Sequence, residues 1–293
     1  MEAIKGRSLL YDAARRIYRN RLAMVMFIVL FIYILMALYS ALNMGGIYNL
    51  ATNHIEDVNR SFVPPFQDKS APFGTDIFGR NVLYRAVYGS KISMYLGFLT
   101  ILIEIPIAII MGALAGYYGG FIDDAIQYLM SIIYSIPGMI IILAFILLVG
   151  PSFLTIALAF ALTGWVGLAR VIRGAFMQAR EFEYVLAART LGAKDGRIIF
   201  KHILPNVFHY VIISAILTFA GVIMSEVLLA YLGLSIVGVP TWGTMIADAS
   251  QEVSAGRWQN FLGAVPFIWL FILALNLIGD ALRDALDPRL RNL

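Results

Sequence analysis

Few side chains in this sequence could carry out covalent or metal chemistry. The chain has no cysteine, so disulfides, thiolate metal sites and cysteine nucleophiles are excluded. Its three histidines, His54, His202 and His209, are too scattered along the chain to predict a metal cluster. No segment matches the phosphate-binding pattern G-x-x-x-x-G-K-[ST], and Gly89-Ser90-Lys91 lacks the required spacing. We therefore expect no catalytic residue, no metal and no ATP hydrolysis in this chain.

Four other side chains lie in or beside long apolar segments, where they need a function or a partner. A carboxylate that faces lipid costs at least about 2.5–3.5 kcal/mol, so Glu104 and Glu226 should face protein or water. Each could line a translocation pathway or form a buried hydrogen bond. Asn276 could likewise line the pathway or join two helices. Trp242 could lie at the mouth of the pathway or anchor the chain at the membrane interface.

The composition indicates an integral membrane protein. Of the 293 residues 60% are hydrophobic and 14% are charged, and the mean hydropathy is +0.81. Soluble domains are roughly 45–50% apolar and about 25% charged. Because a helix needs about 20 apolar residues to cross the hydrocarbon core, we expect an all-α fold with six transmembrane helices. The candidate spans are 22–43, 92–116, 126–149, 152–168, 210–232 and 261–278.

The lysines and arginines are distributed unevenly between the two sides of such a protein. Sixteen of the 22 lie in residues 1–21, in the loop 168–207 and in the tail 282–293. The remaining six lie in the loop 44–91 and at Arg257. The positive-inside rule therefore predicts that both termini and the loop 168–207 are cytoplasmic. Since orientation explains the basic residues, we expect no nucleic-acid partner.

The same pattern gives the domain organisation. We expect a cytoplasmic interfacial helix at 1–21, a first transmembrane helix at 22–43 and an ordered external loop at 44–91. A five-helix core should follow at 92–281, with a cytoplasmic tail at 282–293. Pro106 and Pro137-Gly138 interrupt two of the spans and predict kinks.

The cytoplasmic loop 168–207 is long enough to carry an ordered structure of its own. Its pattern predicts helices at 181–191 and 195–203, with Gly192 as the stop between them and Pro205 ending the second. Ala187 and Ala188 are small enough for another protein to approach closely. The hairpin could dock a partner protein or pack on its own transmembrane bundle.

Four sets of residues in this sequence resemble one family. The run Ala187-Ala188, Gly192 and Leu204-Pro205 is similar to the EAA loop of ABC-importer permeases, although Leu186 replaces the usual glutamate. Residues 72–80 and 88–93 resemble the PxGTDxxGR…YGxRxS signature of the oligopeptide and dipeptide branch, with Ala71 and Lys91 as departures. Residues 115–120 resemble its AGYxGG turn, and residues 279–290 resemble the ending of its C-type subunit. The resemblance covers nearly the whole chain.

The resemblance implies the type I ABC-importer permease fold in a bacterial cytoplasmic membrane. It implies import of dipeptides, oligopeptides or a peptide-like solute by alternating access. The implied partners are a second homologous permease, two cytosolic ATPases that bind ATP and Mg²⁺, an extracytoplasmic substrate-binding protein and lipid. This chain itself should hold no cofactor. The residues expected to couple it to the ATPases are Glu183, Tyr184, Ala187, Ala188, Arg189, Gly192, Ala193, Lys194, His202, Leu204 and Pro205.

Two other classes of protein remain as alternatives. An ion-coupled transporter or channel would be expected to show inverted repeats with paired broken helices. Glu104 and Glu226 lie in dissimilar local sequences and show no such repeat. A membrane enzyme would need a cluster of titratable side chains, and the sequence predicts none.

Overall fold

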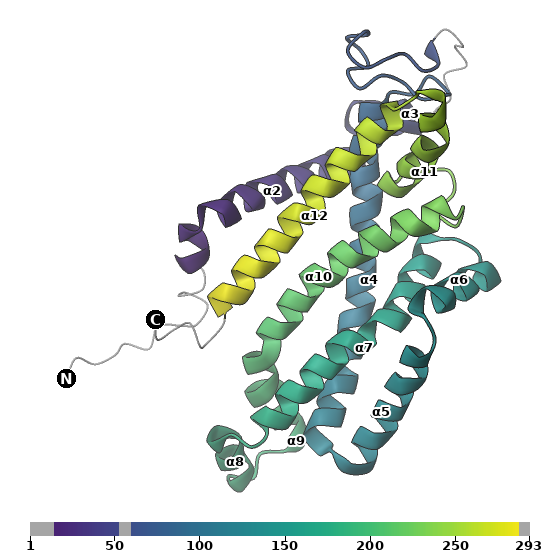
Figure 1. The fold of residues 1–293 in the computed structure, drawn as a ribbon. Helices are drawn as coiled ribbons and strands as arrows, with labels where there is room; N and C mark the ends of the chain where they lie inside the picture. Colours follow the sequence, from purple (N-terminus) through teal and green to yellow (C-terminus); the bar gives the residue numbers. More distant parts are fainter. Residues whose placement is uncertain (1–14, 53–59, 287–293) are drawn as a thin grey trace. The chain divides into compact units, whose positions relative to one another are not determined.

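The computed structural model describes residues 15–52 and 60–286, and all regular elements within these stretches are helical (Figure 1). Residues 15–19 of the expected interfacial helix are helical, whereas 1–14 and the tail beyond Leu286 lie outside the described residues. In chain order the elements are α2 (Arg21–Ala41), η1 (Met44–Gly46), α3 (Ile47–Thr52), α4 (Val82–Tyr118), α5 (Gly120–Ser135), α6 (Gly138–Val149), α7 (Phe153–Ala179), α8 (Glu183–Thr190), α9 (Asp195–Arg197), the π-helix η3 (Ile198–Ile203), α10 (Leu204–Tyr231), α11 (Trp242–Glu252), η4 (Val253–Ala255) and α12 (Gln259–Leu286).

Five helices among the described residues are long and apolar enough to cross a membrane. They are α2, α4, α7, the continuous helix 195–231 and α12. Helices α5 and α6 pass the same criterion together but are bent by 82° at the break between them. Counted as one broken span, this pair brings the number to six, the number that the sequence predicts. Helices suit this environment because they satisfy their own backbone hydrogen bonds.

The two proline motifs of the spans behave differently. Ile136 has φ −106° and ψ 133°, the extended conformation favoured before a proline, and this residue separates α5 from α6. The predicted kink at Pro137-Gly138 is therefore a complete break. Pro106 lies inside α4, and the helix continues on both sides of it.

The chain forms two compact units, residues 1–97 with 220–293 and residues 98–219, and both α4 and α10 contribute to each. In the first unit α12 packs against α2 and α11. The hydroxyl of Tyr33 on α2 donates to the carbonyl oxygen of Phe267 on α12 at 2.7 Å. The Tyr33 ring lies edge-on to Trp242 and Phe271, with centroids 5.8 and 5.0 Å apart. A buried aromatic cluster thus joins three helices of this unit.

The loop before α4 in this unit is held by a buried carboxylate. Asp76 is ion-paired with Arg80 and Arg85 at 2.7 and 2.6 Å and also accepts from the backbone N–H of Arg80. Arg85 on α4 reaches Asp248 of α11 at 3.0 Å and Asn260 of α12 at 3.1 Å. Buried charges need such partners. The network therefore binds the loop 60–81 to three helices.

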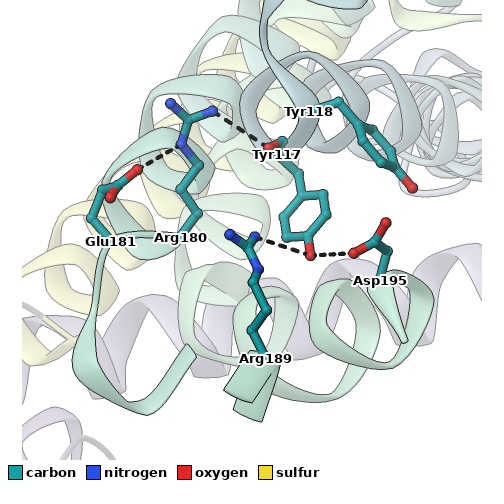
Figure 2. A pocket seen from close by; sticks show the side chains of 6 residues that line it. All are labelled: Tyr117, Tyr118, Arg180, Glu181, Arg189 and Asp195. Atoms are coloured by element: carbon teal, nitrogen blue, oxygen red, sulfur yellow. Dashed lines mark hydrogen bonds and ion pairs between the residues drawn. The ribbon is translucent and has the colours of Figure 1, made fainter. Parts of the chain in front are cut away.

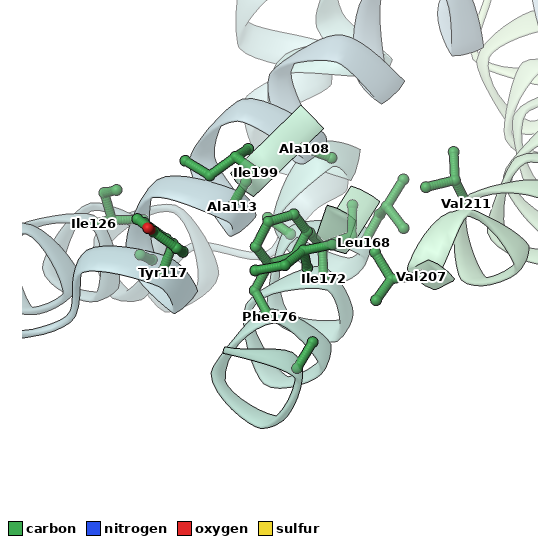
Figure 3. Packing of buried hydrophobic residues seen from close by; sticks show 14 of the residues in the cluster. Ala108, Ala113, Tyr117, Ile126, Leu168, Ile172, Phe176, Ile199, Val207 and Val211 are labelled. Atoms are coloured by element: carbon green, nitrogen blue, oxygen red, sulfur yellow. The ribbon is translucent and has the colours of Figure 1, made fainter. Parts of the chain in front are cut away.

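The second unit has an apolar core between α4, α5, α7, η3 and the beginning of α10 (Figure 3). Its centre is a close contact of α4 with α7. A Cβ atom on Gly112 would lie 2.6 Å from the carbonyl oxygen of Ala169, and one on Gly116 would lie 2.5 Å from that of Arg173. The two glycines form a GxxxG pair, which allows two helix backbones to approach closely. Labelled members of this core include Ala108, Ala113, Ile126, Leu168, Ile172, Phe176, Ile199, Val207 and Val211.

The helices differ from the expected boundaries at three places. Helix α4 begins at Val82, so the last ten residues of the expected loop 44–91 are helical. Helix α7 continues to Ala179, and its Arg173, expected in a cytoplasmic loop, binds Asp123 of α5 with two contacts of 2.6 Å. Pro205 does not end a helix. It follows a π-helix in which the N–H of Leu204 donates to the carbonyl of Ile199, and its missing N–H group falls where the hydrogen-bond pattern changes from π to α, so the helix continues through it.

The contact between α4 and α7 predicts that Gly→Ala at Gly116 destabilises the protein, although this substitution usually stabilises a helix. Gly→Ala within a helix normally stabilises by about 0.5–1 kcal/mol. At Gly116 the new methyl group would meet the α7 backbone, so Gly116→Ala should instead destabilise the protein by about 1–3 kcal/mol. Gly174→Ala on α7 is the matched control, because nothing lies within 4 Å of its Cβ position. Thermal unfolding midpoints of the purified variants in detergent measure the effect. Equal midpoints for the two variants would contradict the backbone contact.

Candidate functional site: the α7–α10 hairpin and the polar residues of the spans

The segment between α7 and α10 folds as a helical hairpin at one end of α7 (Figure 1). Its first helix, expected at 181–191, spans Glu183–Thr190. As expected, Gly192 stops this helix: its φ of +78° suits glycine, and its N–H donates to the carbonyl of Arg189 at 3.0 Å. Ala193 N–H donates to the carbonyl of Ala188 at 3.0 Å. The turn between the two arms is therefore closed by backbone hydrogen bonds.

One face of the hairpin is buried against the rest of its unit. Val185 on α8 and Ile198, Ile199 and Ile203 on the second arm belong to the same apolar core as Phe176 of α7. These side chains fix both arms on the ends of α7 and α10. The hairpin is thus an ordered part of its unit.

The opposite face of the hairpin combines exposed apolar and charged side chains. Leu191 at the tip of the turn is 87% exposed, and Leu186 and Tyr184 on α8 are also exposed. Lys194 is exposed beside them, whereas Arg189, although exposed, is directed toward Tyr117 of α4. An exposed apolar patch with a charged rim is typical of a protein–protein contact surface.

Most of the predicted coupling residues lie on or near this exposed face. Exposed are Glu183, Tyr184, Ala187, Arg189, Gly192, Lys194 and Pro205, and half-buried are Ala188, Ala193, His202 and Leu204. Asn206 on α10 connects the two arms, because its amide donates to the Tyr184 hydroxyl at 3.3 Å and to the His202 carbonyl at 2.7 Å.

A polar pocket of about 320 Å³ lies where the hairpin meets the end of α4 (Figure 2). The Tyr117 hydroxyl donates to Asp195 at 2.7 Å and accepts from Arg189 at 3.3 Å. The hydrogen bond to Tyr117 raises the pKa of Arg189. Arg180 donates to Glu181 at 3.0 Å and to the carbonyl oxygens of residues 116 and 117 at the end of α4. Tyr117 lies in the run that resembles the AGYxGG turn, but no sequence pattern assigned a site role to Tyr117, Arg180 or Asp195.

The acid of the second span, Glu104, is buried inside the unit 98–219. Its carboxylate accepts from the Thr218 hydroxyl of α10 at 3.3 Å. It also lies against Gly164 of α7, where a Cβ atom would come within 2.6 Å of it. Glu104 on α4 therefore contacts both α10 and α7, and the absence of a side chain at Gly164 leaves room for its carboxylate.

Glu226 and Trp242 are both buried in the other unit. The Glu226 carboxylate accepts from Ser235 at 2.8 Å and from Thr241 at 2.7 Å. Thr241 is the N-cap of α11, so the carboxylate lies at the positive end of that helix. The indole N–H of Trp242 donates to the carbonyl of Ala86 at 2.9 Å. Both side chains hold the connection between α10 and α11.

Asn276 is exposed and lines an apolar groove of about 400 Å³. Trp269 and Ile272 on the same helix, Met224 and Val227 on α10 and Ile246 on α11 form most of the remaining wall. Among the four candidate pathway residues, Asn276 alone is both polar and open at a groove. In the part of the chain that the structure describes, no three histidine or acidic side chains are arranged to hold a metal ion.

Comparison with known families gives the same assignment twice. The family model "Binding-protein-dependent transport system inner membrane component" matches residues 105–292, which is well over half of the chain. The model "N-terminal TM domain of oligopeptide transport permease C" matches residues 8–65. The chain belongs to this family of inner-membrane permeases. The resemblance to C-type permeases of the oligopeptide and dipeptide branch, inferred from the motifs, is confirmed.

Individual relatives span nearly the whole permease. The dipeptide transport system permease protein DppC of Bacillus subtilis (strain 168) is 37% identical over 99% of this chain and 89% of its own length. The oligopeptide transport system permease protein OppC of the same strain is 36% identical over 98% and 92%. OppC of Haemophilus influenzae is 34% identical over 98% and 90%. A solved chain of the MetNI methionine ABC transporter, in inward-facing conformations, has a TM-score of 0.45 at 19% identity over 69% of this chain and 96% of that one.

The contacts of Glu226 predict that it has a structural role in this permease. Glu226→Ala removes the acceptor of two buried hydroxyl groups, each of which costs about 1–3 kcal/mol when left unsatisfied. We expect a lower thermal unfolding midpoint in detergent, with Glu226→Gln closer to the wild type because its amide oxygen can still accept. A Glu226→Ala variant with an unchanged midpoint and lost transport would instead indicate a pathway residue.

Proposed function

We propose that this chain is one of two channel-forming subunits of an ATP-driven importer that moves dipeptides or oligopeptides by alternating access. Family membership supports the role of permease, and the names of the DppC and OppC relatives support the substrate class. The observation that carries the proposal is the hairpin, whose one face is buried in the core while the other presents Leu191 and its neighbours outward.

The outward face of the hairpin is the docking site for a cytosolic ATPase. Leu191 and Leu186 supply apolar contacts, and the small side chains of Ala187 and Ala188 let the partner approach the helix backbone. Lys194 adds a positive charge at the edge of this surface. The isoleucines on the inner face transfer a displacement of the hairpin to the bundle, because closely packed side chains have low compressibility.

The rest of the assembly follows from this division of roles. A second, homologous permease completes the channel, two ATPases bind ATP and Mg²⁺, and a substrate-binding protein delivers peptide from outside. The excess of basic residues in 1–21, 168–207 and 282–293 supports cytoplasmic termini and a cytoplasmic hairpin in a bacterial inner membrane. The ion-coupled transporter left open by the sequence gains no support from the family or the relatives.

Asn276 is our first candidate for a residue that lines the pathway, because it is a polar group at an otherwise apolar groove. Glu104 is the second, since a buried carboxylate with one long hydrogen bond could accept another donor, such as a peptide amine. Glu226 and Trp242 already have buried partners, so we assign them to the connection before α11.

Leu191→Glu tests the docking site. Burying a carboxylate in an apolar contact is costly, so the variant should insert normally but lose co-purifying ATPase subunits and uptake of an isotope-labelled peptide digest. Val237→Glu is the control, because Val237 is comparably exposed at 81% but lies outside the hairpin. Pull-down from membranes in mild detergent, followed by mass spectrometry, measures the subunits. Wild-type ATPase recovery with Leu191→Glu would refute the docking site.

Asn276→Leu tests the pathway. The substitution keeps the approximate side-chain volume but removes both the donor and the acceptor. We expect peptide uptake to fall by about tenfold, consistent with about 1.4 kcal/mol for one lost polar contact, while ATPase subunits still co-purify. Leu277→Ala, on the same helix but outside the groove, should retain uptake. Normal uptake with Asn276→Leu would remove this residue from the pathway.

A further inference from the structure

We propose that the Tyr117 hydroxyl is the joint that ties both arms of the hairpin to α4 and transmits hairpin movement along this helix. The inference rests on the proposed role of the hairpin as an ATPase docking site. It assigns a positioning role to a residue that touches neither the outward face of the hairpin nor the apolar groove at Asn276.

The Tyr117 side chain reaches both arms of the hairpin from α4 (Figure 2), as Asn206 does from α10. Its ring is only 5% exposed and belongs to the apolar core, so α4 holds it firmly. Its hydroxyl accepts from Arg189 near the end of α8 and donates to Asp195 at the beginning of α9. These two residues stand on either side of the turn 191–194. A charged donor, a hydroxyl and a carboxylate in series reinforce one another.

The hydroxyl differs in kind from the apolar contacts that hold the hairpin, and it differs from the Asn206 amide in tying the arms to α4 instead of α10. Val185, Ile198 and Ile203 contribute apolar packing, which holds the arms against the bundle but, because it is non-directional, does not set their orientation. Hydrogen bonds depend on angle as well as distance, so the pair at Tyr117 sets the orientation of both arms relative to α4. The guanidinium of Arg189 also lies 5.6 Å from the centre of the Tyr117 ring.

The neighbouring contacts make the end of α4 move with the base of the hairpin. Arg180, at the end of α7, donates to the last carbonyl groups of α4 at 3.3 and 3.4 Å. One and five residues before Tyr117, Gly116 and Gly112 bring α4 against the α7 backbone. Glu104 lies 13 residues before Tyr117 on the same helix, or about 20 Å at 1.5 Å per residue. A rotation imposed at Tyr117 therefore reaches the buried carboxylate.

The variant Tyr117→Phe removes the joint with little risk to folding. Phenylalanine keeps the ring in the core, and Arg189 and Asp195 are both exposed, so each can bond to water instead. In the complete importer, reconstituted in proteoliposomes with its ATPases and binding protein, ATPase subunits should bind at wild-type affinity. Uptake of an isotope-labelled peptide digest per ATP hydrolysed should fall by about three- to tenfold, the factor expected for one or two net hydrogen bonds.

Three further variants distinguish a joint from a general structural contact. Tyr118→Phe is the matched control, because Tyr118 lines the same pocket but is 45% exposed at the end of α4. It should keep wild-type uptake per ATP. Asp195→Ala should reproduce the loss, whereas Asp195→Asn, which retains an acceptor oxygen, should restore most of the coupling.

Each remaining outcome overturns a definite statement. Wild-type uptake per ATP with Tyr117→Phe would show that the hydroxyl transmits nothing. Reduced ATPase affinity with Tyr117→Phe would show that it only shapes the docking surface, which also refutes transmission but leaves the proposed function intact. Failure of the proposed function itself would be seen separately, as normal ATPase binding by Leu191→Glu.

Discussion

The close approach of α4 to α7 is the constraint on which the unit 98–219 depends. Helices in lipid gain little from burying apolar side chains against one another, so close backbone packing and polar contacts must hold them. Gly112 and Gly116 provide that packing, because they expose the α4 backbone to Ala169 and Arg173. Once α7 lies at this distance, the Arg173 side chain reaches Asp123 and fixes the beginning of α5. The hairpin that continues from α7 is then placed beside the end of α4.

Polar side chains in this permease fasten the connections between helices. Asp76 and Arg85 join the loop before α4 to α11 and α12. Glu226 holds the turn between α10 and α11 through two hydroxyl groups. Each carboxylate is buried and receives several donors, which is the condition under which a buried charge is tolerated. Polar contacts at the ends of the helices therefore specify how the helices are connected, and the spans themselves can consist of apolar residues.

The hairpin divides its two tasks between two faces. Its inner isoleucines and valine join the core that also contains Phe176, so the hairpin is anchored to the bundle. Its outer face exposes Leu191, Leu186 and Lys194, the surface that we propose binds the ATPase. The π-helix 198–203 continues directly into α10, so the same segment is both an arm of the hairpin and the beginning of a span. This continuity supports the proposed transfer of movement from an ATPase to the transmembrane helices.

The sequence by itself determined the spans, the hairpin with its Gly192 stop and the family, because apolar length, charge distribution and local motifs are all properties of adjacent residues. It did not reveal that α4 begins at Val82, that α7 extends to Ala179 or that the helix passes through Pro205. The GxxxG spacing of Gly112 and Gly116 is present in the sequence, but the sequence does not show that the helix packed against it is α7. Only the tertiary structure decided that Glu226 and Trp242 are held by buried partners, that Asn276 lines a groove and that Tyr117 meets Arg189 and Asp195. The reason is physical: whether a polar group is buried, exposed or hydrogen-bonded depends on groups far away in the chain. Trp242 binds Ala86, 156 residues away, and Tyr33 binds Phe267, 234 residues away.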